Sequence, residues 1–164
     1  MKLKKIKEII RILGADEPDY PSIISKLTKE DYLIVNKLTK NRSSAIATRA
    51  IICLGWLGSE EFVESIAPAA KSEDPSLRVA AVQAFGKIKG ANKNQLVVNL
   101  VNGLLDDKEV AIRKFALKTT GIAGISTLKE KIKQISENDQ SDKIKKLAGE
   151  VLQKLKIVDD TPIL

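Results

Sequence analysis

The chain has 164 residues, with 28 Lys and Arg against 21 Asp and Glu, which gives a formal charge of +7 near neutral pH. This length predicts one compact domain. Aromatic residues make up only 4% of the chain, so the core must be built mainly from Leu, Ile, Val and Ala. A single cysteine and no histidine exclude a disulfide framework and the usual Cys/His zinc sites.

The first 13 residues are basic and apolar, but Lys7, Glu8 and Arg11 interrupt the uncharged stretch that a signal peptide needs. The longest apolar run, from Ala50 to Leu57, is far shorter than the roughly 18 residues of a membrane span. We therefore expect a cytoplasmic protein without a membrane span.

Helical periodicity runs along the whole chain, and no strand pattern competes with it. A leading helix is predicted at 2–13 and a short one at 21–27. Four helix pairs follow, at 29–39 with 44–57, 60–71 with 75–88, 93–105 with 108–123, and 127–136 with 142–156. Pro68 is expected to kink or shorten its helix, and Gly58, Gly90 and Gly124 are expected at helix ends.

The second helices of these pairs repeat one pattern. With Leu77 as offset 0, small and apolar residues fall at offsets 3, 4, 7, 8 and 11, which form one helix face. The pattern returns with offset 0 at Ile46, Ile112 and Ile144, at spacings of 31, 35 and 32 residues along the chain. Such spacings predict a solenoid.

The residues Asp74-Pro75, Leu77-Arg78 and Phe85-Gly86 with Ile88 resemble the second helix of a HEAT repeat of the short bacterial and archaeal type. The resemblance covers roughly residues 29–156. It implies an all-α fold, an α-α superhelix formed by a short HEAT-like solenoid of about four helix pairs with an N-terminal capping helix. The domains would be capping helices at 1–28, repeats at 29–156 and a C-terminal tail at 157–164.

In this family, the arginine after offset 0 and the acidic residue at the helix start often form contacts between neighbouring repeats. The resemblance therefore implies that Arg78 with Asp74, and Arg113 with Asp107, are structural pairs. Ala47 occupies the arginine position in the first repeat, so the ladder is expected to be broken there.

No residue of the chain points to a reaction. The lack of histidine removes the commonest general base, and Cys53 falls at a core position without a basic neighbour. Adjacent carboxylates are expected to cap helices or to be solvated, and no third one completes a metal site. Although HEAT-like proteins include a DNA glycosylase type and chromophore lyases, we expect this chain not to be an enzyme and to hold no metal or cofactor.

The second helices are expected to line the concave face, where offsets 2, 5, 6 and 9 point away from the packed side. Offset 5 carries an apolar line of Ile51, Val82 and Leu117, which either binds a partner or is covered by the next repeat. The candidate partner-binding residues are Ile51, Ile52, Trp56, Val82, Gln83, Lys114, Leu117, Lys118 and Lys146.

The leading interpretation is therefore a non-enzymatic scaffold or adaptor that binds another protein or peptide through the concave face. The alternative is an adaptor for nucleic acid or another polyanion, because residues 1–49 carry 11 basic and 6 acidic groups and residues 108–164 carry 12 and 8. The sequence supports only weak attraction to nucleic acid, since aromatic residues are scarce. The amphipathic leading helix is expected to cap the first repeat rather than to lie on a membrane.

Overall fold

The computed structural model describes residues 2–159. All regular secondary structure in this part of the chain is helical, as the sequence predicted. The elements are α1 Lys2–Leu13, α2 Tyr20–Lys26, α3 Lys29–Leu38, α4 Ser44–Leu57, η1 Glu60–Phe62, α5 Val63–Ala70, α6 Pro75–Phe85, α7 Gln95–Leu104, α8 Val110–Ala123, η2 Ser126–Leu128, α9 Lys129–Asn138 and α10 Asp142–Asp159.

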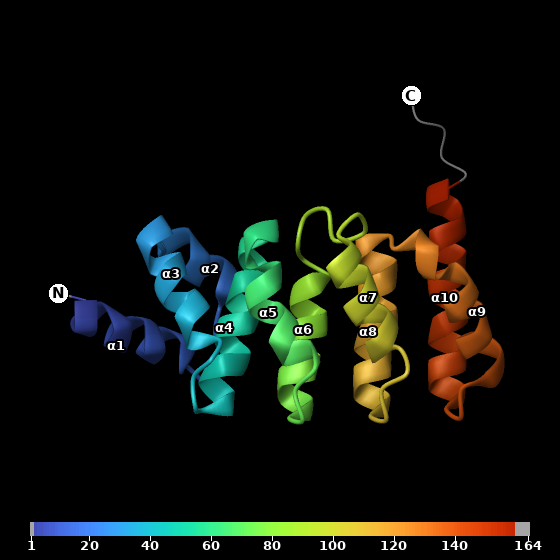
Figure 1. The fold of residues 1–164 in the computed structure, drawn as a ribbon, viewed down its shortest axis with the longest axis horizontal. Coiled ribbons are helices and arrows are strands. Elements are labelled where there is room, and N and C mark those ends of the chain that lie inside the picture. The colour runs from blue at the N-terminus through green and yellow to red at the C-terminus, as the bar shows by residue number, and fades with distance from the viewer. Residues whose placement is uncertain (1, 160–164) are drawn as a thin grey trace.

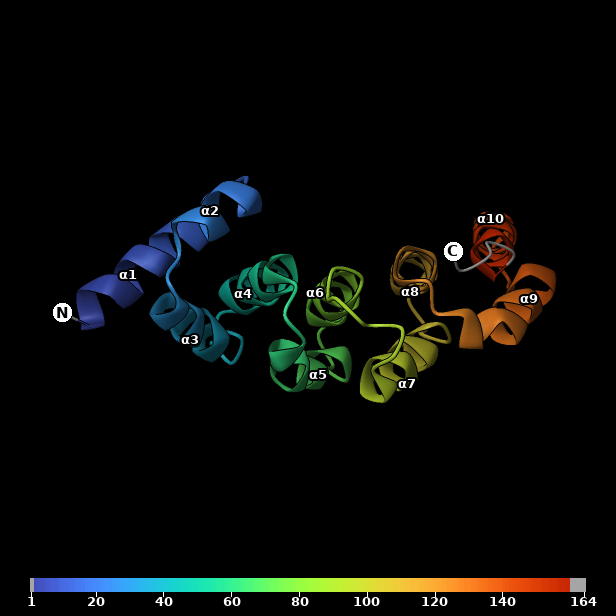
Figure 2. The same cartoon turned by 90° about the horizontal axis from the view of Figure 1, so that it is seen from above.

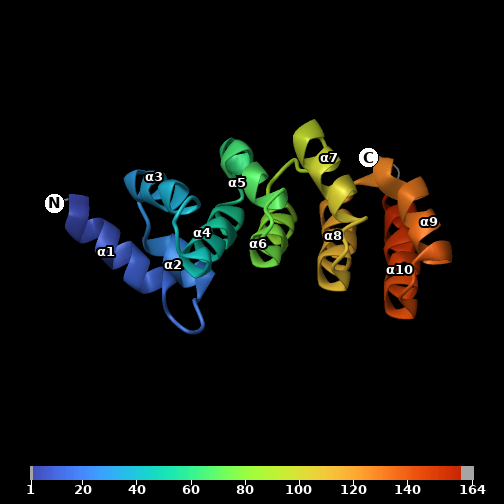
Figure 3. The same cartoon turned by 60° about the horizontal axis from the view of Figure 1, so that its bottom comes forward.

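The helices form two layers that follow the same curve (Figure 2). The outer layer contains α3, α5, α7 and α9, and the inner layer contains α4, α6, α8 and α10, which line the concave side. The inner helices lie side by side, and each contacts the next one along the stack (Figures 1 and 3). The predicted α-α superhelix of four helix pairs is confirmed.

The helices α1 and α2 lie at the N-terminal end of the stack and contact the first pair, α3 and α4. Ile9 and Leu13 on one face of α1 are buried in the core, and the Arg49 guanidinium donates to the Leu13 carbonyl at 3.0 Å. The division into capping helices, repeats and tail stays a prediction. Helix α10 extends to Asp159, and the rest of the predicted tail, 160–164, lies outside the described residues.

Local sequence sets the helix ends. The Asp74 carboxylate accepts a hydrogen bond from the Ser76 amide at 2.8 Å, and Pro75 follows at the position where a missing N–H costs least. Gly58 and Gly124 end α4 and α8 with φ of 68° and 66°, a left-handed conformation that glycine adopts without strain. Pro68 lies inside α5, which ends two residues later at Ala70.

The core is aliphatic, as the composition predicted, with Phe85 as its largest fully buried side chain. Cys53 is buried among these residues, which confirms its predicted place in the core. Burial raises the pKa of its thiol to about 12, so the group stays protonated at neutral pH. The thiol therefore acts as a small apolar side chain.

Neighbouring inner helices approach each other at glycines nine residues after offset 0. A Cβ on Gly55 would lie 2.5 Å from the Ala84 Cα, so only glycine fits between α4 and α6. The equivalent contact of Gly86 is with the Thr119 hydroxyl, which donates to the Val82 carbonyl at 2.7 Å. Gly55 lies in the last turn of α4 and sets the distance to α6.

The substitution Gly55→Ala is expected to destabilise the fold by about 1 to 3 kcal/mol, because the added methyl group meets backbone that cannot rotate away. The matched change Gly149→Ala in α10 meets no atom within 4 Å and is expected to stabilise the chain by about 0.5 to 1 kcal/mol. Chemical denaturation of both variants measures the difference. Equal effects in the two variants would contradict the close approach.

Arg78 joins the second repeat to the third. Its Nε lies 2.7 Å from the Asp107 Oδ2 and its Nη2 lies 3.1 Å from the Asp107 Oδ1, a two-point ion pair. Its Nη1 donates to the carbonyl groups of Ser72 and Glu73 in the preceding turn. All three nitrogens of this largely buried guanidinium are therefore satisfied.

Arg113 repeats this arrangement one unit further on. Its Nε lies 2.8 Å from the Asp139 Oδ2, and its Nη2 donates to the Asp139 Oδ1 at 3.0 Å. The ladder therefore exists, but the expected carboxylate partners, Asp74 for Arg78 and Asp107 for Arg113, are wrong by one repeat. Arg113 contacts Asp107 only through its backbone carbonyl, at 3.0 Å. Each guanidinium points along the stack, so it reaches the carboxylate in the turn before the second helix of the next repeat.

The first rung has no arginine, because Ala47 occupies that position and is buried. The Ser44 hydroxyl instead donates to the Asp74 carboxylate across the same junction. A neutral hydroxyl thus replaces the guanidinium where the first and second repeats meet.

The ladder also changes the pKa values of its acids. Burial of Asp107 acts to raise its pKa, but hydrogen bonds from the Arg78 guanidinium and the Glu109 amide outweigh it and hold the pKa below its usual range. The same balance, with Arg113 and the Ser141 amide as donors, lowers the pKa of Asp139. Both carboxylates therefore stabilise the fold in their charged form.

The substitution Arg78→Leu is expected to cost about 2 kcal/mol or more at neutral pH, because it leaves the Asp107 charge and two carbonyl groups without their donor. Since the pKa of Asp107 is lowered in the fold, this loss is full above about pH 5 and shrinks as acid protonates the carboxylate below its unfolded pKa of about 3.9. Urea titrations between about pH 7 and pH 2.5, with the exposed Arg42→Leu as control, measure it. A loss that does not depend on pH would rule out the ion pair as its source.

Candidate functional site

Each inner helix exposes one strip of residues to the concave side. The outer layer covers one side of each inner helix. The next repeat covers the side at offsets 5 and 9, and the preceding repeat covers the side at offset 7. Offsets 2, 6 and 10 lie one turn apart on the side that remains. We call these residues the concave strip: Thr48, Ile52, Trp56, Val79, Gln83, Lys87, Lys114, Lys118, Ile122, Lys146, Glu150 and Lys154.

Three of the residues predicted to bind a partner are not on this strip. Ile51, Val82 and Leu117 are each 0% exposed, so their assignment to a binding surface is wrong. Offset 5 is rotated toward the next repeat, and these side chains fill the space between neighbouring inner helices. The alternative, that they extend the core, is correct.

The other six predicted residues lie on the concave strip. Ile52 and Gln83 are half-buried, whereas Trp56 and the three lysines are exposed, at positions 114, 118 and 146. Lys87, Ile122 and Lys154 also lie on the strip but were not predicted, because offset 10 was not among the offsets expected on the concave face, although the predicted Trp56 shares it. This offset lies one turn beyond offset 6, so helical spacing alone could have found it.

The chemistry of the strip changes along the stack. The N-terminal part of the strip carries Trp56, which is 38% exposed. The Lys87 ammonium lies 3.5 Å from the centre of the Trp56 indole ring, a cation–π contact. Toward the C-terminal end the strip carries the exposed lysines of α8 and α10, and Glu150 is its one acid. Ile122, which is 74% exposed, adds an apolar contact between these charges.

Within residues 2–159, no three Asp, Glu or Cys side chains gather where they could hold a metal ion. No helix in the described part of the chain is both long and apolar enough to cross a membrane. The concave strip itself offers positive charge, an indole ring and aliphatic surface.

A two-layered stack of helix pairs with a concave inner face defines the class of α-solenoid proteins. A family model described as HEAT repeats matches residues 33–116, just over half of the chain. The chain belongs to the HEAT-repeat family, which confirms the resemblance seen in its sequence.

Among solved structures, the chain is similar to one in the structure of the complex of CpcE and CpcF of phycocyanin lyase from Nostoc sp.. The TM-score is 0.71 at 16% sequence identity, and the alignment covers 91% of this chain and 98% of that chain. A comparison with curated proteins finds no match.

This likeness corrects the expectation that the chain is not an enzyme. A chain of the same fold belongs to a complex described as a lyase, so the solenoid fold does not exclude enzymatic activity. At 16% identity the likeness shows the fold, and it assigns no reaction to this chain.

Two adjacent residues of α8 test the boundary between core and strip. Leu117→Asp is expected to cost about 4 kcal/mol or more, or to unfold the chain, because it places a carboxylate in the apolar space between repeats. Lys118→Asp, which changes an exposed side chain, is expected to stay within about 1 kcal/mol. Thermal unfolding followed by circular dichroism compares them. If Leu117→Asp folds as stably as Lys118→Asp, offset 5 faces solvent after all.

Proposed function

We propose that this HEAT-repeat protein is a scaffold that binds an acidic segment of another protein along the concave strip. The observation that carries the proposal is the strip itself, where five lysines and one glutamate surround exposed apolar side chains. Complementary charge speeds the encounter and selects the partner, while apolar contacts supply affinity.

Trp56 and Ile122 are the proposed apolar contacts. Both are large and exposed, and tryptophan is enriched among the residues that contribute most to binding. The cation–π contact with Lys87 holds the indole ring in one place, so less conformational entropy is lost on binding. Lys114, Lys118 and Lys146 would attract the acidic segment.

The likeness to CpcE and CpcF supports a protein partner, because that structure is a complex of two proteins. No observation favours the alternative of nucleic acid. The concave strip has no arginine and a single aromatic residue, whereas single-stranded nucleic acid is usually bound by stacking on several aromatic rings.

Site-specific photo-crosslinking tests the proposal. A photoreactive phenylalanine analogue at position 122 is expected to capture one acidic protein from lysate of the source organism, identified by mass spectrometry. The same analogue at Asn102, an exposed residue of the outer helix α7, is the matched control. Capture of the same protein at both positions would contradict a concave site, and capture of nucleic acid would favour the polyanion alternative.

Charge reversal then tests the lysines with the purified partner. Lys118→Glu is expected to weaken binding about tenfold, because it sets like charges against each other. Lys133→Glu in the outer helix α9 makes the same change in net charge and is expected to have little effect. Trp56 is the only tryptophan of the chain, so a change in its fluorescence reports binding at the strip directly. Equal effects of the two reversals would contradict the proposed site.

A further inference from the structure

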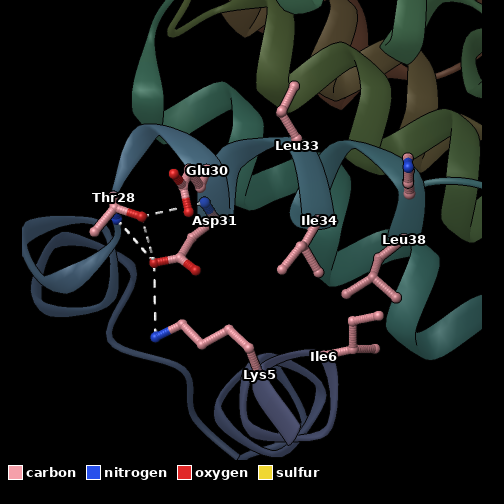
Figure 4. A pocket seen from close by; sticks show the side chains of 9 residues that line it. Lys5, Ile6, Thr28, Glu30, Asp31, Leu33, Ile34 and Leu38 are labelled. Atoms are coloured by element: carbon pink, nitrogen blue, oxygen red, sulfur yellow. Dashed lines mark hydrogen bonds and ion pairs between the residues drawn. The ribbon is translucent and has the colours of Figure 1, made fainter. Parts of the chain in front are cut away.

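A second surface, separate from the concave strip, lies at the N-terminal end of the molecule, where α1 meets α3. The two helices leave an apolar groove of about 690 Å³ between them (Figure 4). Ile6, Ile34 and Leu38 line its apolar part, whereas the side chain of Leu33 projects from α3 away from α1.

The polar end of the groove is already satisfied. The buried Asp31 carboxylate accepts hydrogen bonds from the Thr28 amide and hydroxyl, both at 2.9 Å, and lies 3.7 Å from the Lys5 ammonium. The Asp31 charge is therefore already paired, and the open part of the groove is its apolar part.

Two of the large apolar side chains exposed in the described residues belong to this end of the molecule. Leu33 is 62% exposed and Leu3 is 66% exposed. Apolar surface gathered around an apolar groove is unfavourable in water and commonly marks an interface.

The charges on α3 indicate what covers this surface. Glu30, Leu33 and Lys37 follow at spacings of three and four residues, so they form one exposed line with opposite charges at its two ends. Neither Glu30 nor Lys37 forms an ion pair within residues 2–159.

We propose that a second copy of this chain binds here, with the two α3 helices antiparallel across a two-fold axis. Glu30 and Lys37 lie equally far from the point between residues 33 and 34. A two-fold axis at this point sets Glu30 of each copy against Lys37 of the other. It also sets Leu33 of each copy beside Ile34 of the other.

A second copy fits this line better than a partner of one charge sign. An acidic segment would match Lys37 but repel Glu30, and a basic segment would do the reverse. Two-fold symmetry is the commonest arrangement of soluble oligomers, and it requires a self-complementary surface of this kind. The helix α3 belongs to the outer layer, so the dimer leaves the concave strip accessible (Figure 2).

Sedimentation equilibrium of the full chain tests the proposal. The wild-type chain is expected to dimerise, and Glu30→Lys or Lys37→Glu alone is expected to weaken the dimer about tenfold or more, because each change creates two like-charge contacts. A mixture of the two single variants is expected to regain wild-type affinity as a heterodimer. The double variant Glu30→Lys/Lys37→Glu is expected to dimerise with itself.

Two further variants act as controls. Glu64→Lys, an exposed charge reversal in α5, is expected to leave the dimer unchanged. Leu33→Ala is expected to weaken the dimer about fivefold or more while leaving thermal unfolding of the monomer unchanged, because the side chain is exposed. A wild-type chain that stays monomeric would overturn the proposal, as would a dimer that Glu30→Lys does not weaken or that the mixture does not restore.

Discussion

The close approach of neighbouring inner helices is the constraint on which the rest of this structure depends. At the junction of α4 and α6, Gly55 packs directly on the backbone of Ala84, and this contact fixes how each helix is rotated about its axis. Once the rotation is set, offsets 5, 7 and 9 are committed to neighbours. Only offsets 2, 6 and 10 remain for a partner, so the packing of the repeats determines the composition of the concave strip.

Two kinds of interaction join the repeats, and their relative importance changes from the first junction to the later ones. The glycine contact is closest at the first junction, where a Cβ on Gly55 would be 2.5 Å from its neighbour, and it opens to 3.5 Å for Gly121 at the last. The first junction has no arginine, whereas the later ones have Arg78 and Arg113. Ion pairs therefore reinforce the junctions at which backbone packing is less close.

The sequence predicted the helices, the repeats and the family because these depend on local periodicity. Two predictions were wrong for the same reason: Val82 was assigned to the binding surface, and Arg78 was paired with Asp74 instead of Asp107. A pattern along one helix shows which side is apolar, but it does not show in which direction the next repeat lies. That direction follows from contacts such as the one between Gly55 and Ala84, which join residues about thirty positions apart in the sequence. Lys114, Lys118 and Lys146 are exposed, and their role in binding stays a prediction.

The two exposed surfaces differ in what they can recognise. The concave strip carries mostly positive charge, so two copies of it repel each other and it is suited to a different, acidic partner. The line on α3 carries one charge of each sign around Leu33, so a two-fold axis satisfies it with its own copy. Because the surfaces lie on opposite layers of the solenoid, a dimer would present two concave strips at once. A partner with two acidic segments would then bind more tightly than one with a single segment, since the second contact forms at high effective concentration.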